Sequence, residues 1–370
     1  MTRLIIAIVT GLILVTLFAT KDVVADTSAI KLSDIEQKVG IIVAEFNAED
    51  DKKFYKTCTG TLIGIRHILT AASCLFASTE PYKKAYSIYF YPGVRRSNEM
   101  PYGRYPLVKS FVTQAHYREF LGKDDDENNI ALAVLGKSFE QNDAGDIVGW
   151  MGFWGKSTTA EGEVAVLSYT SDSLFSAREF NNDCQLVAMS DKRLAFSCVL
   201  DDGGIGAPLI RYTKEHKLKY VLGVTTSVPI QYSNGSKLTP IRHGIFSDII
   251  DDKYAPQNNK EKFIEISHPQ PKRYSLFVAN RCIKPLKAAV HFKDFDGNWK
   301  TNGFMLVDKG QTIPFAETAN AIFYFSGTYD GGQTFANKAK LIVDIDNNDI
   351  PFETRQIDKY GDYIYTFNCD

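Results

Sequence analysis

Short runs of alternating apolar and polar residues follow one another along most of this chain of 370 residues. The runs are rich in β-branched and aromatic side chains and are bounded by Gly, Asn, Asp or Pro, a pattern typical of β-strands and turns. In the first two thirds of the chain, strands are expected at residues 39–44, 61–63, 67–70, 86–91, 108–116 and 130–135. The sequence therefore predicts an all-β fold.

The pattern is interrupted once, at residues 251–272, which are polar and contain several prolines. Such a composition is typical of a linker. Beyond it the alternation resumes, and strands are expected at residues 274–282, 288–292, 303–307, 321–325 and 363–368. These runs predict a small β-sandwich or barrel, residues 273–370, that follows a larger domain of residues 26–250. Within it, the acidic run 344–349 lacks the spacing of a calcium-binding EF-hand, and a solvated turn is favoured.

The N-terminal residues 1–25 have a different character. Arg3 precedes an apolar stretch, residues 4–19, and small residues that end at Ala25 offer a cleavage site, as in a secretory signal peptide. Retention of this segment as an anchor is the alternative. In both cases the folded part is expected to be exported, secreted or periplasmic, and no other run is long enough to span a membrane.

Charge and cysteine content narrow the partners and the chemistry. With 42 basic and 44 acidic residues the net charge is -2, so no strong positive electrostatic field that would attract nucleic acid or anionic lipid is expected.

Six cysteines in an exported chain indicate disulfides. They fall into three local groups, which favours the pairs Cys58–Cys74, Cys184–Cys198 and Cys282–Cys369. Zinc is the competing interpretation, but the chain has no C-x-x-C or H-E-x-x-H motif, so no metal is expected.

Residues 57–76 combine two short β-branched runs, a turn at Gly64 and a cysteine near each end. This predicts a hairpin clamped by a disulfide. The order C-T-G-T-L-I, followed by I-L-T-A-A-S-C, resembles the segment that carries the catalytic histidine in trypsin-like serine proteases. The position of that histidine is occupied here by Ser73.

A second resemblance lies at residues 128–135, N-N-I-A-L-A-V-L. Trypsin-like proteases carry their catalytic aspartate directly before such a strand, and the equivalent position here is Asn129. An amide can orient a partner, but it has no charge with which to stabilise an imidazolium. The acidic run 124–127 nearby offers carboxylates, and a solvated loop is favoured over a relocated catalytic acid.

Residues 195–209 resemble the nucleophile segment of the glutamyl-endopeptidase-like branch of the same family. The cysteine, the acidic turn and the glycines follow that frame, but the nucleophile position is Ile205, whose side chain cannot form an acyl-enzyme. The resemblance leaves the backbone N–H groups of Gly203 and Ile205 as a remnant of an oxyanion hole. It also places Thr225 where glutamate-specific members have a histidine in the wall of the substrate pocket.

The resemblance covers about residues 38–250 and implies a double six-stranded β-barrel. Because all three triad positions are substituted, it also implies a catalytically inactive homologue, a pseudoprotease that binds or regulates a protein or peptide partner and needs no cofactor. The alternative is an endopeptidase with weak activity from displaced residues. The last domain, with its D-G-N-W turn at residues 296–299, resembles a small bacterial domain family of unknown function.

Overall fold

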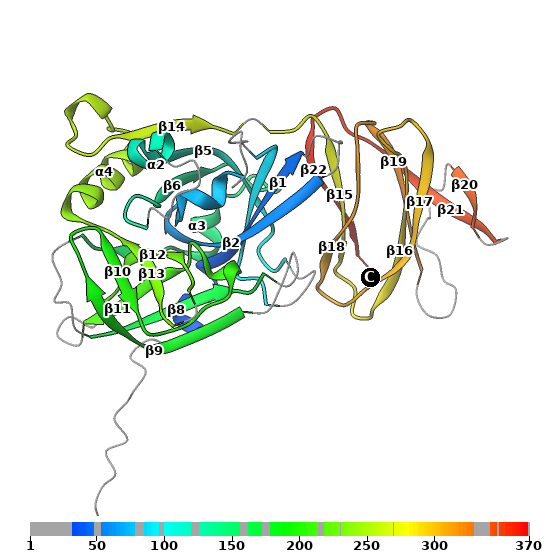
Figure 1. Ribbon diagram of the computed structural model, residues 1–370. Coiled ribbons are helices and arrows are strands. Elements are labelled where there is room, and N and C mark those ends of the chain that lie inside the picture. Colours follow the sequence, from blue (N-terminus) through cyan, green and yellow to red (C-terminus); the bar gives the residue numbers. More distant parts are fainter. Residues whose placement is uncertain are drawn as a thin grey trace, which may run out of the picture.

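Two closed β-barrels and a smaller β domain follow one another along the chain (Figure 1). The computed structural model describes residues 32–47, 53–77, 85–95, 100–119, 126–155, 162–171, 178–213, 218–229, 231–268, 270–328, 341–345 and 348–368. The expected signal segment, residues 1–25, lies outside these ranges. The strand pairings confirm the predicted fold class, a double six-stranded barrel followed by a β domain.

Six antiparallel strands form the first barrel, and pairing of β5 with β6 closes it. In sheet order they are β5 (Tyr105–Thr113), β4 (Ser87–Pro92), β1 (Val39–Asn47), β2 (Lys53–Gly64), β3 (His67–Thr70) and β6 (Ala131–Leu135). Almost all of β1 is buried because its two faces pack in different directions. Ile42 and Phe46 fill this barrel, whereas Val39 and Ile41 belong to a core shared with the second barrel.

The second barrel has the same number of strands and is closed by pairing of β11 with β12. In sheet order they are β11 (Pro208–Thr213), β8 (Glu163–Tyr169), β9 (Arg178–Met189), β10 (Arg193–Phe196), β13 (Ser233–Lys237) and β12 (Leu218–Ser227). A short strand, β7 (Gly152–Phe153), pairs in parallel with β12. Val166, Phe196 and Leu222 are among the side chains that fill this barrel.

A shared apolar core holds the two barrels together. Leu167 and Tyr169 of β8 pack in it beside Val39 of β1. The Tyr169 hydroxyl also donates to the backbone carbonyl of Val94 in barrel one, at 3.0 Å. Because both barrels bury apolar side chains in this one core, the core fixes their position relative to each other. It thereby also fixes the segments that meet between the barrels.

In the described part of the chain, helices are few and short. They are α1 (Leu32–Ile35), α2 (Gln114–Glu119), α3 (Ala144–Val148), α4 (Pro240–Ile250) and the 3₁₀ helices η1 (Ala72–Leu75), η2 (Asp202–Gly204) and η3 (Pro256–Asn258). Thr239 caps α4, because its Oγ1 accepts a hydrogen bond from the Arg242 N–H at 3.1 Å. Within the described ranges, no helix is both long and apolar enough to cross a membrane.

Two expected boundaries differ from the structure. The strand expected at residues 108–116 ends at Thr113, and His116 lies on α2. The expected linker, residues 251–272, contains β14 (Phe263–Ser267), which adds to the edge of the first barrel by pairing with β5. Phe263 and Ile266 are buried there, so part of this segment belongs to the barrel.

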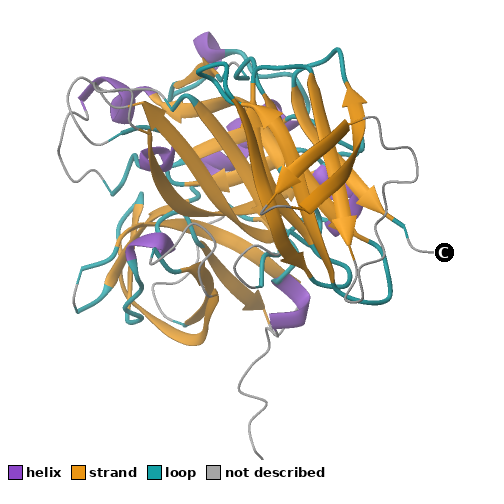
Figure 2. Ribbon diagram, turned by 90° about the vertical axis from the view of Figure 1, so that its right-hand side faces the viewer, coloured by secondary structure: helices purple, strands orange, loops and turns teal. Residues whose placement is uncertain are grey.

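The last domain is a sandwich of two sheets, and its strands face the viewer in Figure 2. Its own core includes Leu276, Val290 and Phe325. One sheet contains β18 (Thr312–Thr318), β15 (Tyr274–Asn280) and β22 (Gly361–Phe367). The other contains β17 (Trp299–Val307), β16 (Leu286–Lys293), β19 (Ile322–Thr328), β21 (Asn348–Gln356) and β20 (Leu341–Ile345).

Candidate functional site

Ser73 and Asn129 lie side by side at one end of barrel one. The Asn129 side chain accepts a hydrogen bond from the Ser73 backbone N–H through Oδ1 (2.8 Å) and donates to Ser73 Oγ through Nδ2 (3.1 Å). The contact follows from the sheet, because β3 and β6 are antiparallel neighbours with Thr70 opposite Ala131. Residues just after β3 and just before β6 therefore meet.

A disulfide fixes the segment that carries Ser73. Ser73 lies in η1, and the bond between Cys58 and Cys74, whose Cα atoms are 5.9 Å apart, ties η1 to β2. The second predicted bond, Cys184–Cys198, is also present, so both pairings are confirmed. Cys282 is disulfide-bonded as well, and its predicted partner Cys369 lies outside the described residues.

Ile205 reaches the same region from the second barrel. Its backbone carbonyl accepts a hydrogen bond from the Thr59 N–H (2.9 Å) and lies 3.7 Å from Cys74 Sγ. Its partly buried side chain packs against the apolar interior of barrel one. The structure thus brings together the three segments that carry Ser73, Asn129 and Ile205. Their equivalence to triad positions stays a prediction.

The two amides predicted to line an oxyanion hole already have partners within the chain. The Gly203 N–H donates to Asp201 Oδ1 at 3.0 Å, and the Ile205 N–H donates to the Asp202 carbonyl at 3.2 Å. Burial opposes ionisation of Asp201, but hydrogen bonds from Ser171 and Gly203 outweigh it and lower the pKa of its carboxyl group. A bound carbonyl would therefore have to compete with an ionised carboxylate for the Gly203 amide.

The glycines of this turn are required by packing alone. At Gly206 the backbone has a φ of +85°, and a Cβ atom there would lie 2.2 Å from the Thr59 carbonyl oxygen. A Cβ atom on Gly203 would lie 2.5 Å from the Tyr169 carbonyl oxygen. A larger residue at position 206 would press against β2 of the first barrel, and one at position 203 would press against β8 of the second barrel itself, so both glycines are needed for the fold whether or not the site is catalytic.

No family model matches the chain, and no curated protein matches it. Among solved structures, it is similar to the protease Anisep from Arthrobacter nicotinovorans, with 15% identity and a TM-score of 0.46 over 58% of this chain and 96% of that one. A Glu endopeptidase solved in complex with MPD gives 14% identity and a TM-score of 0.44 over 58% and 89%. The serine protease AL20 from an extremophilic microorganism gives 14% identity and a TM-score of 0.44 over 55% and 92%.

The tandem pair of closed six-stranded barrels decides the fold, independently of these scores. The fold is that of trypsin-like serine proteases. At such low identities the likeness concerns the fold alone, and it transfers no activity to this chain.

One residue of this trypsin-like frame, Lys56, was missed by the sequence analysis. Its Nζ donates a hydrogen bond of 2.6 Å to the Ser73 carbonyl. Burial lowers the pKa of its ammonium group to about 8, although the charge of Asp202 opposes this shift. The sequence could have indicated this contact. Lys56 and Cys58 are two positions apart on β2, so their side chains lie on the same face of the strand. The disulfide from Cys58 to Cys74 therefore brings Lys56 close to Ser73.

We expect Lys56 to titrate with a midpoint near pH 8, far below an ordinary lysine, because burial disfavours its charged form. The ¹³Cε shift of each lysine, followed by NMR from pH 6 to pH 12, measures this. Lys53 is the internal control: burial would lower its pKa, but a hydrogen bond to Glu45 and the negative charges of Glu317 and Glu45 together outweigh burial and raise the pKa from its ordinary value of 10.5. A Lys56 midpoint as high as that of Lys53 would contradict the prediction.

Thr225, the predicted wall of the substrate pocket, is fully buried. Its backbone N–H donates to the Ala207 carbonyl at 2.9 Å, and its carbonyl accepts from the Gly206 N–H at 2.8 Å. Thr225 therefore supports the turn that follows Ile205 from beneath, and its role in recognising a substrate stays a prediction.

The acidic run before Asn129 is more than a solvated loop. Asp126 is largely buried, accepts a hydrogen bond from Thr226 Oγ1 (2.7 Å) and forms an ion pair with Arg193 (3.6 Å). This corrects the sequence-based interpretation for Asp126, whereas Asp124 and Asp125 lie outside the described residues. These contacts hold the segment before Asn129 against the second barrel.

Arg242 strengthens the same attachment. Its buried guanidinium group donates to the Glu127 carbonyl (2.8 Å) and to Ser236 Oγ (2.8 Å), and it pairs with Glu261 at 2.7 Å. No local pattern marks this residue in the sequence, because its partners lie up to 115 positions away.

Proposed function

We propose that this chain is an exported, catalytically inactive relative of trypsin-like serine proteases that acts as a binding or regulatory protein for a protein or peptide partner. One observation carries the proposal: the residue at the expected nucleophile position is Ile205. Its side chain has no lone pair and no acidic proton, so it can neither attack a carbonyl group nor be activated by a base.

The other two expected positions support the same conclusion. A general base must accept a proton near neutral pH, and neither a serine hydroxyl nor an asparagine amide does so. The hydrogen bonds between Ser73 and Asn129 also satisfy both side chains within the protein. Removal of the nucleophile or the base alone from the subtilisin triad, a worked case for this chemistry, costs about a million-fold in turnover. Here all three positions are changed together.

A weak endopeptidase remains the second candidate because of Lys56. A lysine with a pKa of about 8 is partly neutral under mildly alkaline conditions and could serve as a base for the Ser73 hydroxyl. Its Nζ now contacts the Ser73 carbonyl oxygen, so this use requires the ammonium group to turn toward Oγ. Isoleucine at position 205 and the occupied amides of Gly203 and Ile205 weigh against this candidate.

A fluorophosphonate probe should not label the purified protein, and casein turnover should equal that of a buffer blank, because no activated hydroxyl is available. Active trypsin, treated in parallel, is the positive control for probe and substrate. Peptide mapping by mass spectrometry would locate any label. A label on Ser73 that disappears in Ser73→Ala and in Lys56→Met would overturn the proposal and support the second candidate.

A further inference from the structure

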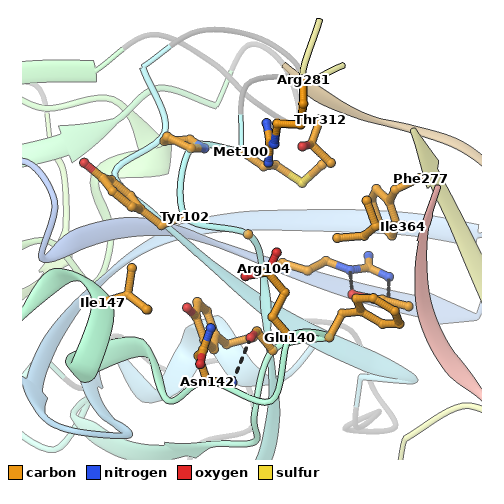
Figure 3. Close-up of a pocket in the computed structure, with 16 residues that line it drawn as sticks. Met100, Tyr102, Arg104, Glu140, Asn142, Ile147, Phe277, Arg281, Thr312 and Ile364 are labelled. Carbon is orange, nitrogen blue, oxygen red and sulfur yellow. Dashed lines mark hydrogen bonds and ion pairs between the residues drawn. The ribbon is translucent and has the colours of Figure 1, made fainter. Parts of the chain in front are cut away.

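Ion pairs attach the three-stranded sheet of the last domain to barrel one. In the first set, which we call the Arg273 cluster, the Arg273 guanidinium group pairs with Glu45 of β1 (2.6 Å) and with Glu317 of β18 (3.1 Å). In the second, Arg104 Nε lies 2.6 Å from Asp362 Oδ2 of β22, and both residues line a cavity of about 140 Å³ (Figure 3). The five-stranded sheet therefore lies on the far side of this domain, and β20 and β21 project away from the barrels (Figure 1).

The two edges of this five-stranded sheet differ. One edge is β17, which carries a bulge: its pairing with β16 shifts between Ala288 and Val290, and Phe304 in the bulge has a φ of +38°. Such a bulge hinders the addition of a further strand. The other edge, β20, has the sequence L-I-V-D-I, contains neither proline nor lysine, and keeps a regular register with β21 throughout. The edge at β20 therefore lacks the usual protection against pairing with another chain.

The register shows which backbone groups of β20 point away from β21. Ile342 lies opposite Pro351, which has no N–H, so these two residues form a pair without hydrogen bonds. The two-residue loop between Ile345 and Asn348 gives the same alternation, because the pair that closes such a hairpin is hydrogen-bonded. The N–H and C=O groups of Ile342 and Asp344 therefore point outward, and no described residue bonds to them.

Near its turn the hairpin of β20 and β21 is a ribbon of two strands. β21 pairs with β19 from Glu353 to Gln356, but residues 348–352 pair with β20 alone among the described strands. A two-stranded ribbon is marginally stable in water, and a third strand stabilises it. Ile342 is 66% exposed, so the outer edge of β20 is open to solvent. A strand from another chain can add there.

The side chains of the hairpin select the kind of strand. Asp344 and Asp349 lie directly opposite each other, and like charges in such positions repel. Neither forms an ion pair with a basic residue in the described part of the chain. On the other face of β20, Leu341 and Val343 are partly buried. A lysine or arginine beside Asp344 would relieve the repulsion, and apolar residues at alternate positions would extend the apolar face.

We propose that the outer edge of β20 binds an extended peptide segment of a partner protein, in which lysine or arginine alternates with apolar residues. The segment adds as a third strand, and its backbone bonds to the outward N–H and C=O groups of β20. A basic side chain lies beside Asp344, and apolar side chains lie beside Leu341 and Val343. This surface is separate from the segments that carry Ser73 and Ile205, so it does not depend on whether the chain is catalytic.

The test uses fluorescein-labelled octapeptides and the purified full chain, with binding measured by fluorescence anisotropy. A peptide of alternating valine and lysine should bind with a Kd of about 0.1 mM or below, and one of alternating valine and glutamate about 10-fold more weakly or less. N-Methylation of the lysine residues removes the N–H groups that face β20 and should abolish binding. N-Methylation of the valine residues leaves those groups intact and should have little effect.

Two variants of β20 test the geometry. Ile342→Pro removes an outward N–H, a change that an edge strand tolerates, and should weaken binding of the lysine peptide about 10-fold or more. Asp344→Lys places a cation opposite Asp349, so the hairpin should stay folded, but the variant should repel the lysine peptide and bind it about 10-fold more weakly. Asp308→Lys makes the same change of charge at an exposed position between β17 and β18; it is the matched control and should bind as the parent does.

Several outcomes would overturn the proposal. They are no binding of the lysine peptide, equal binding of the lysine and glutamate peptides, binding that survives N-methylation of the lysines, or parent-like binding by both β20 variants. Sedimentation equilibrium tests the other occupant of the edge. A parent dimer that Ile342→Pro dissociates would assign the edge to a second copy of this chain and would also overturn the proposal.

Discussion

Replacement of Glu45 by glutamine should lower the free energy of unfolding by about 3–5 kcal/mol at neutral pH. The change removes a buried negative charge and leaves the Arg273 guanidinium group without its closest counter-ion, the costly way to break a buried ion pair. Both side chains are only 4% exposed, and the pair joins β1 to the start of the last domain across 228 positions of sequence.

The stability lost in Glu45→Gln should become smaller as the pH falls. Burial alone would raise the pKa of Glu45, but hydrogen bonds from Arg273 and Lys53 outweigh it and lower the pKa from 4.5 to about 2. A group with a lowered folded-state pKa stabilises the protein fully above its unfolded pKa, and this contribution fades as pH falls from about 4.5 toward 2. The difference between parent and Glu45→Gln should therefore shrink over that range, by about 3 kcal/mol in total.

Urea unfolding of both proteins at pH 7, 4 and 2.5 measures this difference. Glu265→Gln is the matched control, because Glu265 is half exposed and lies 3.7 Å from Lys109. Such a surface pair contributes at most about 1 kcal/mol. A Glu45→Gln effect as small as the control, or one that does not change with pH, would show that the Arg273 cluster does not hold the last domain to the barrel.

Strands of the first barrel and of the last domain could be located in the sequence because a strand depends on the local pattern of apolar residues. Residues 39–44 are apolar at every position, and they form a strand buried on both faces. The strand β14 was missed because its alternating residues, F-I-E-I-S, stand between polar and proline-bearing stretches that are typical of a linker. His116 was assigned to a strand because a six-residue helix is too short to show a helical period.

Only those features of the site that depend on residues close together in the sequence could be predicted. The resemblance located Ser73 beside a disulfide and Asn129 beside a strand, and the sheet then brings the two residues into contact. The partners of Gly203 and of Arg273 could not be predicted. They depend on how a turn closes and on which domains meet, and no sequence pattern specifies either.

The triple change Ser73→His, Asn129→Asp and Ile205→Ser should convert a protein that a fluorophosphonate probe does not label into one that it does. A triad acts as a unit, so none of the three single changes should produce labelling. The contact between Ser73 and Asn129 places the new histidine next to the new aspartate, and the Cys58–Cys74 bond fixes η1 on which the histidine would lie. Ile205→Ser removes apolar bulk from a partly buried position, which should cost about 1–2 kcal/mol of stability.

The control is the same triple variant with Ile205→Ala in place of Ile205→Ser, which has the base and its partner but no nucleophile. Only the serine version should be labelled, and peptide mapping should find the label at position 205. Peptide turnover should stay low even then, because the Gly203 and Ile205 amides are occupied by Asp201 and Asp202 and a tetrahedral intermediate would have to displace them. A triple variant that melts cooperatively with both disulfides intact, yet takes no label, would contradict the prediction: either the turn no longer has the geometry of an oxyanion hole, or position 205 is not the nucleophile position of this fold.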